Sequence, residues 1–166
     1  MSLIDGIKHV AQRTKKGYSY RDLWSIDWWF LTVIPNMLED FANEKYLGIP
    51  MSVIIKFEQE HPEITGDEKD EACIQQWRNT IREIAHHLRE AHLPKDQTNE
   101  YDNEFFDSYN INGILTQEDF NKPLTPEQEE IRAKWRKRQD EIEKYQQEQF
   151  KIGMQMLTDN MFDLWW

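Results

Sequence analysis

The chain has a single cysteine, Cys73, so neither a disulfide framework nor a cluster of thiolate metal ligands can be built. Its six glycines are scattered, and no glycine-rich phosphate loop is present. No serine occupies the strained turn that carries a hydrolase nucleophile. These absences leave little catalytic chemistry, and we expect a binding protein without a cofactor rather than an enzyme.

Long apolar runs are also missing. No stretch approaches the roughly 18 residues that cross a bilayer, and residues 1–6 lack a signal-peptide hydrophobic region. We therefore expect an intracellular protein that does not act at a membrane. Basic residues are the minority, because 20 Lys and Arg against 31 Asp and Glu give a net charge of −11. This charge disfavours direct binding to nucleic acid. It favours either high solubility of the protein or an acidic surface that binds a basic partner.

The most apolar stretch runs from Trp24 to Phe41. It is hydrophobic on almost every side, which predicts a buried central helix with Trp29, Phe30, Val33 and Met37 in the core. Pro35 lies inside this stretch and should kink the helix, because it removes one backbone hydrogen bond.

Helical periodicity predicts the remaining elements. Residues 67–93 carry one continuous apolar stripe with Cys73 on or beside it, which indicates a buried thiol. Residues 3–12 form a short amphipathic helix, and residues 52–58 favour a helix over a strand. Residues 95–124 are polar and predict a long ordered loop. The fold predicted for residues 1–166 is mostly α: a single-domain helical bundle.

A long C-terminal helix should begin at Thr125-Pro126, which supplies a cap and a favourable first residue. Only Gly153 could break it. Its first half is polar and should project from the body, so we expect a homo-oligomer built through this helix. The two C-terminal tryptophans should pack on the central helix or join the same interface. The predicted interface residues are Trp135, Ile142, Tyr145, Trp165 and Trp166.

Two metal-binding patterns occur. Glu58/His61 and Glu83/His86 have the spacing that di-iron bundles use, but Glu83 and His86 lie opposite the apolar stripe and should face solvent, so no metal site is predicted. The acidic runs at 68–71 and 104–107 are similar to the magnesium-binding pairs of all-α nucleoside triphosphate pyrophosphohydrolases. Such an enzyme is an alternative, although the gap between the runs is long.

Aromatic residues offer a candidate binding site at the start of the apolar stretch. Trp24 and Trp28 fall on one helix face. This face is either a second apolar surface that the C-terminal helix covers or part of a pocket for a planar ligand. In the pocket interpretation, Arg21 would bind phosphate or carboxylate. The candidate ligand-binding residues are Tyr20, Arg21, Trp24, Asp27 and Trp28.

The segment from Gly17 to Trp29, with its Trp-Ser-Ile-Asp sequence, and the ending Phe-Asp-Leu-Trp-Trp resemble a family of small uncharacterised tailed-phage proteins. The resemblance covers about a fifth of the chain. It implies a phage or prophage origin and action in the bacterial host cytoplasm.

Small acidic phage proteins without catalytic motifs often inhibit host machinery or defence systems. The resemblance therefore implies an inhibitor that occludes a basic host-protein surface or sequesters a nucleotide ligand. The alternatives are the magnesium-dependent pyrophosphohydrolase and a purely structural homo-oligomer. A bound ligand of a few hundred daltons would favour nucleotide sequestration. Magnesium-dependent turnover would favour the enzyme, and a stable assembly without ligand would favour the structural protein.

Overall fold

The structure, a computed structural model, describes residues 3–108 and 123–165, and within these ranges all regular structure is helical. The mostly α fold with a long C-terminal helix is confirmed, as is the helix over the strand at residues 52–58. The elements are α1 (Leu3–Lys16), the short 3-10 helix η1 (Tyr20–Trp24), α2 (Ile26–Asn43), α3 (Met51–Glu60), α4 (Asp67–His92), α5 (Asp102–Ser108), α7 (Pro126–Asn160) and the 3-10 turn η2 (Met161–Asp163).

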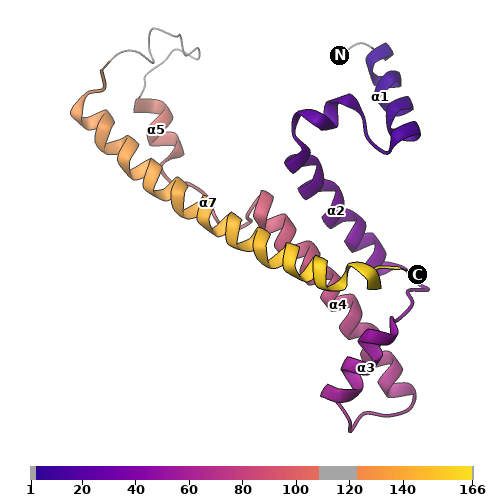
Figure 1. Cartoon of the computed structure of the whole chain (residues 1–166). Coiled ribbons are helices and arrows are strands. Elements are labelled where there is room, and N and C mark those ends of the chain that lie inside the picture. Colours follow the sequence, from indigo (N-terminus) through magenta and orange to yellow (C-terminus); the bar gives the residue numbers. More distant parts are fainter. Residues whose placement is uncertain (1–2, 109–122, 166) are drawn as a thin grey trace.

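Helix α4 is the centre of the molecule. It packs against α2 and α7 along its length and against α3 near its start, as Figure 1 shows. Its apolar stripe is buried as the periodicity predicts, and Cys73 is buried with it. Burial also raises the pKa of the Cys73 thiol, which makes this residue a structural one. The fully buried stripe residues are Trp77, Ile81, Ile84 and Leu88.

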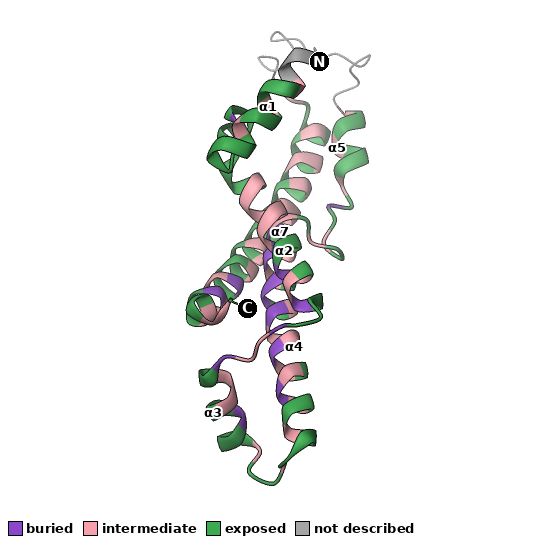
Figure 2. Cartoon of the chain, turned by 90° about the vertical axis from the view of Figure 1, so that its right-hand side faces the viewer, coloured by how far each residue is buried: buried purple, intermediate pink, exposed green. Residues whose placement is uncertain are grey.

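The apolar stretch 24–41 forms a helix as predicted, α2, but this helix is not buried on almost every side. Only the C-terminal half of α2 is buried, through Pro35, Leu38 and Ala42, while Met37, expected in the core, is exposed. The N-terminal half extends beyond the end of α4, where Trp28 meets the terminal His92 with ring centroids 6.1 Å apart. The exposed start of α2 is visible in Figure 2.

Arginines of α4 hold the C-terminal half of α2. Arg78 donates to the backbone carbonyls of Ala42 and Glu44, which lie at the end of α2 and have no partner within the helix. Arg89 donates to Glu39 at 3.1 Å and to the carbonyl of Pro35 at 3.3 Å. The helix continues through Pro35 as one element.

Gly153 of α7 lies against Leu88 and His87 of α4. This glycine is buried, and a Cβ added to it would lie 3.0 Å from Leu88 Cδ2. Gly153 therefore does not break α7. Its missing side chain allows α7 to pack closely on α4 at this point.

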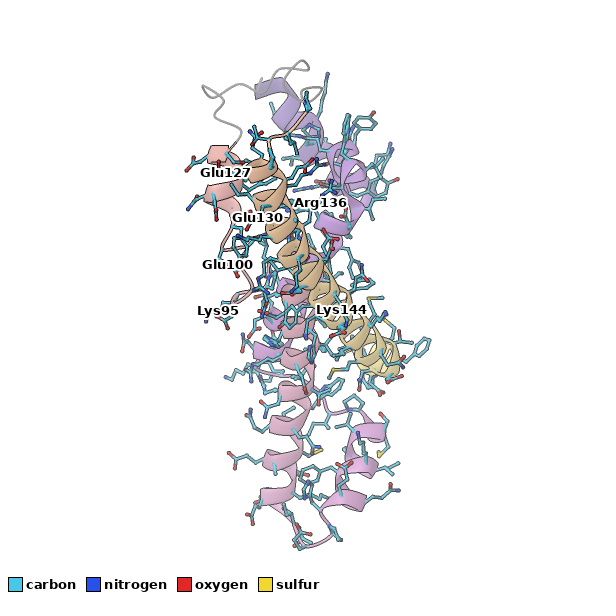
Figure 3. The ribbon with its side chains drawn as sticks, turned by 90° about the vertical axis from the view of Figure 1, so that its left-hand side faces the viewer. Lys95, Glu100, Glu127, Glu130, Arg136 and Lys144 are labelled. Atoms are coloured by element: carbon cyan, nitrogen blue, oxygen red, sulfur yellow. The ribbon has the colours of Figure 1, made fainter. Side chains whose placement is uncertain are left out.

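The first half of α7 begins as predicted, at a Thr125 cap whose hydroxyl accepts from the Gln128 amide. It is covered by residues 97–108, here called the strap, which includes α5. Arg138 donates to the carbonyl of Thr98 and to Glu100, both at 3.1 Å. Figure 3 labels Lys95 and Glu100 on this side of α7.

The strap forms part of the predicted loop 95–124, which therefore contains one short helix, while residues 109–122 of that loop lie outside the described residues. Figure 1 shows the resulting shape. The strap and the start of α7 rise on one side, α1 and the start of α2 rise on the other, and the α3–α4 turn lies at the opposite end.

Candidate functional site

A cavity of about 600 Å³ lies where α1 and η1 meet the start of α2. Gly17, with φ +78, ends α1 and reverses the chain, so that η1 returns alongside α1. We call this cavity the tryptophan pocket. It is lined by Gly6, His9, Arg13, Ser19, Arg21, Asp22, Trp24, Ser25, Trp28 and Trp29.

An ion pair holds the two sides of the tryptophan pocket together. The Arg13 guanidinium donates to Asp22 through two nitrogens, at 2.6 and 3.1 Å. Asp22 also accepts the backbone N–H of Ser19 at 2.6 Å, and Gln12 accepts the N–H of Tyr20 at 2.8 Å. Two parallel bonds from one guanidinium fix orientation as well as distance. The wall that carries Arg21 and Trp24 is therefore fixed to α1.

The Asp22 carboxylate should make this arm of the molecule sensitive to acid. Its bond to Arg13, and then its bond to the Ser19 amide, hold its pKa well below the ordinary value of 3.8. A lowered pKa stabilises the folded arm above that ordinary value, and the stabilisation is lost as the pH falls below it. In the wild type, the protection of the Ser19 amide against hydrogen exchange should decrease as the pH is lowered below 3.8.

The matched variant is Asp22→Asn, which keeps the shape of the side chain but cannot titrate. This variant should show weaker protection of the Ser19 amide than the wild type at neutral pH, and no further loss as the pH is lowered below 3.8. Equal protection in the two proteins at pH 7 would contradict the role assigned to the ion pair.

Three of the five predicted ligand-binding residues meet in this pocket: Arg21, Trp24 and Trp28. The other two do not line it. Tyr20 lies in η1 and is 63% exposed, and Asp27 lines a separate groove between α2 and α7. His9 and Arg13 also line the pocket, and no local pattern predicts them, because they meet α2 only through the turn at Gly17. Trp29, predicted in the core, lines the pocket as well.

The tryptophans are open to solvent. Trp24 is 83% exposed and Trp28 is 55% exposed, so α7 does not cover this face of α2. One lining residue, His9, carries a buried ring nitrogen, Nδ1, that has no hydrogen-bond partner among the described residues. Aromatic faces beside cationic side chains suit a ligand that is both planar and anionic.

Charge is unevenly distributed along the chain. Residues 1–24 carry five Lys and Arg and only two Asp, a net charge of +3 in a chain whose total is −11. The opposite end, at the α3–α4 turn, is strongly acidic. Between residues 58 and 71 the chain has seven carboxylates, all on exposed residues, and one base, Lys69, which pairs with Glu58 at 2.7 Å. The tryptophan pocket thus lies in a basic segment of an acidic chain, and a second basic run, residues 132–138, lies in the first half of α7.

The predicted interface residues of α7 make contacts within the chain. The Trp135 ring stacks on Phe105 with centroids 4.5 Å apart, Ile142 is buried, and the Tyr145 hydroxyl donates to Glu90 at 3.0 Å. Trp165 is exposed beyond η2, and Trp166 lies outside the described residues. An oligomer interface through these residues stays a prediction.

The metal patterns do not converge in space. Glu83 and His86 are exposed, as the helical periodicity predicts, and the described residues contain no group of three potential ligands. The acidic run at 68–71 begins α4, whereas the run at 104–107 lies in α5 at the other end of the molecule (Figures 1 and 2). Within one chain these carboxylates cannot share a magnesium ion.

No family model matches the chain, and neither the curated proteins nor the solved structures contain a match to it. Among the described helices, none has the length and apolar character needed to cross a membrane. The geometry and charge of the tryptophan pocket therefore carry the functional argument.

Proposed function

We propose that this protein is a non-enzymatic binding protein that sequesters a nucleotide in the tryptophan pocket. The observation that carries this proposal is the exposed pair Trp24 and Trp28 beside Arg21, in a cavity that also contains Arg13 and His9. A nucleobase would stack on an indole ring, and the guanidinium group of Arg21 would bind its phosphates.

The dimensions and charge of the pocket support the same ligand class. Its volume of about 600 Å³ falls in the range of roughly 300–1,000 Å³ typical of small-molecule sites. Residues 1–24 carry a net positive charge in a chain whose total is −11, so a small anion can bind there, whereas a long nucleic acid would also meet the acidic surface beyond them. This arrangement favours a mononucleotide or dinucleotide over a polymer.

The test begins with native mass spectrometry of protein purified gently from bacterial cytoplasm, followed by calorimetric titration with ADP, GDP and a cyclic dinucleotide. We expect one of these nucleotides to bind. Trp24→Ala should weaken its binding about 10-fold or more, since a base stacked on an aromatic ring contributes about 1–3 kcal/mol. Arg21→Ala should weaken binding through loss of a phosphate contact.

The matched control is Tyr46→Ala, which removes an equally exposed aromatic ring far from the pocket, beyond the end of α2. It should bind as the wild type does. Absence of binding at millimolar nucleotide, or wild-type affinity in Trp24→Ala, would overturn the proposal.

The acidic α3–α4 turn supports a second candidate, occlusion of a basic protein surface. Its seven exposed carboxylates lie at the end of the molecule opposite the tryptophan pocket, where a basic partner could bind without contacting the nucleotide. Reversing Glu68 and Glu71 to lysine should abolish capture of such a partner and leave nucleotide binding intact. A phage origin, action on a host defence system in the bacterial cytoplasm, and homo-oligomer formation belong to the same proposal.

A further inference from the structure

Helix α1 is oriented with its polar side inward. Gly6, His9 and Arg13 line the tryptophan pocket, and Gln12 bonds to the Tyr20 amide. The apolar side faces solvent, where Ile7 is 62% exposed and Val10 is 67% exposed. Figure 2 shows the outer side of α1 as exposed. An amphipathic helix normally buries its apolar stripe, so this orientation indicates a missing partner.

The helix has little other support in its own chain. Among the described elements it contacts η1 and packs extensively on no other. A helix of 14 residues is marginal in water without tertiary packing. A partner that covers Ile7 and Val10 would supply that packing.

The same chain contains a matching groove. A cavity of about 530 Å³, here called the α2–α7 groove, opens where α2 and α7 diverge above the end of α4. Leu31, Ala91 and Phe150 form its apolar part, and its charged residues are two carboxylates, Asp27 and Glu143, against one lysine, Lys151. Lys8, Lys15 and Lys16 give α1 the opposite charge. The groove is therefore complementary to α1 in both polarity and charge.

We propose that α1 of one copy lies in the α2–α7 groove of a second copy, and that the exchange is reciprocal. The groove reaches Asp27, in the same turns of α2 as Trp24 and Trp28, so the arm and its receptor site are neighbours on each molecule. That proximity permits a closed two-fold dimer in which both arms are used. An anionic membrane is the less suitable occupant, because the body that would approach with α1 carries a large negative charge.

This dimer does not depend on the proposed nucleotide function, because it uses the outer side of α1 and leaves the tryptophan pocket open. Its first test is light scattering on the full chain after size-exclusion chromatography, without nucleotide. The wild type should have twice the mass of its 20.2 kDa chain. The double variant Ile7→Glu, Val10→Glu should be monomeric. The matched control Met51→Glu, Ile55→Glu places the same charges on exposed apolar residues of α3 and should stay dimeric.

A second test locates the contact. Protein carrying Val10→Cys is mixed with a mass-tagged protein carrying Phe150→Cys under mild oxidation, and Cys73 is buried and does not compete. We expect a disulfide-linked heterodimer, with little product when Met51→Cys replaces Val10→Cys. A monomeric wild type, a dimer insensitive to Ile7→Glu, Val10→Glu, or binding of α1 to phosphatidylglycerol vesicles in place of dimerisation would each overturn the proposal.

Discussion

Replacing Gly153 with leucine should lower the free energy of unfolding by about 2–3 kcal/mol. The Cβ alone would lie 3.0 Å from Leu88 Cδ2 and 3.2 Å from His87 Cβ, and leucine adds three further carbons. Leu88 is completely buried, and close-packed interiors leave a buried side chain little room to move aside. Leucine is also a better helix former than glycine, so the loss would come from packing alone. Urea unfolding followed by circular dichroism measures it.

Gly6→Leu is the matched control. It makes the same substitution inside a helix, but a Cβ at Gly6 meets nothing within 4 Å. It should leave stability unchanged or slightly higher. A loss in Gly6→Leu equal to that in Gly153→Leu would show that the crossing of α4 and α7 is not the cause.

A double variant provides a second check. Leu88→Ala alone should cost about 2–5 kcal/mol by leaving a cavity. Combined with Gly153→Leu, it provides space for the new side chain, so the loss in the double variant should be smaller than the sum of the single losses. Strict additivity would mean that the two residues do not touch.

Local signals in the sequence predicted the helices well. The strict three- and four-residue spacing from Ile74 to Ala91 identifies the buried side of α4, because a helix packed on both sides must keep its apolar residues in register. The Thr125-Pro126 cap is a signal of the same kind, because it acts on the first turn of α7 alone. Such features require no knowledge of the rest of the chain.

Features that depend on distant packing were not predictable. The composition of residues 24–41 indicates burial on every side, yet α4 ends at His92 and leaves the first turns of α2 uncovered. Gly153 has the sequence signature of a helix break, and only the position of Leu88 shows that it permits a crossing. In both cases the deciding information is the length and path of another helix.

The residues of the candidate site likewise include some that local sequence predicts and some that it does not. Arg21, Trp24 and Trp28 are close in sequence, and helical spacing was enough to group them. His9 and Arg13 join them only because the chain reverses at Gly17 and because Asp22 pairs with Arg13. Asp27 is adjacent to Trp28 in sequence but points to the α2–α7 groove, since successive residues of a helix are rotated by about 100°.

Replacing Trp135 with alanine should release the strap from α7 and leave the core folded. The Trp135 ring stacks on Phe105 at an interplanar angle of 16°, and its Nε1 donates to Asp102 at 2.7 Å. Losing both contacts should lower the free energy of opening of residues 99–108 by about 2 kcal/mol, because aromatic packing and one hydrogen bond are removed. Hydrogen exchange should show lost protection in the strap and unchanged protection in α4.

The matched control is Trp135→Phe, which keeps an aromatic ring for stacking and removes only the hydrogen bond, so it should cost about 1 kcal/mol. The same pair of variants tests the oligomer interface predicted from the sequence. Because Trp135 is engaged by Phe105 within its own chain, Trp135→Ala should leave the assembly state unchanged. Dissociation of an oligomer with the strap still protected would instead assign this tryptophan to a contact between copies.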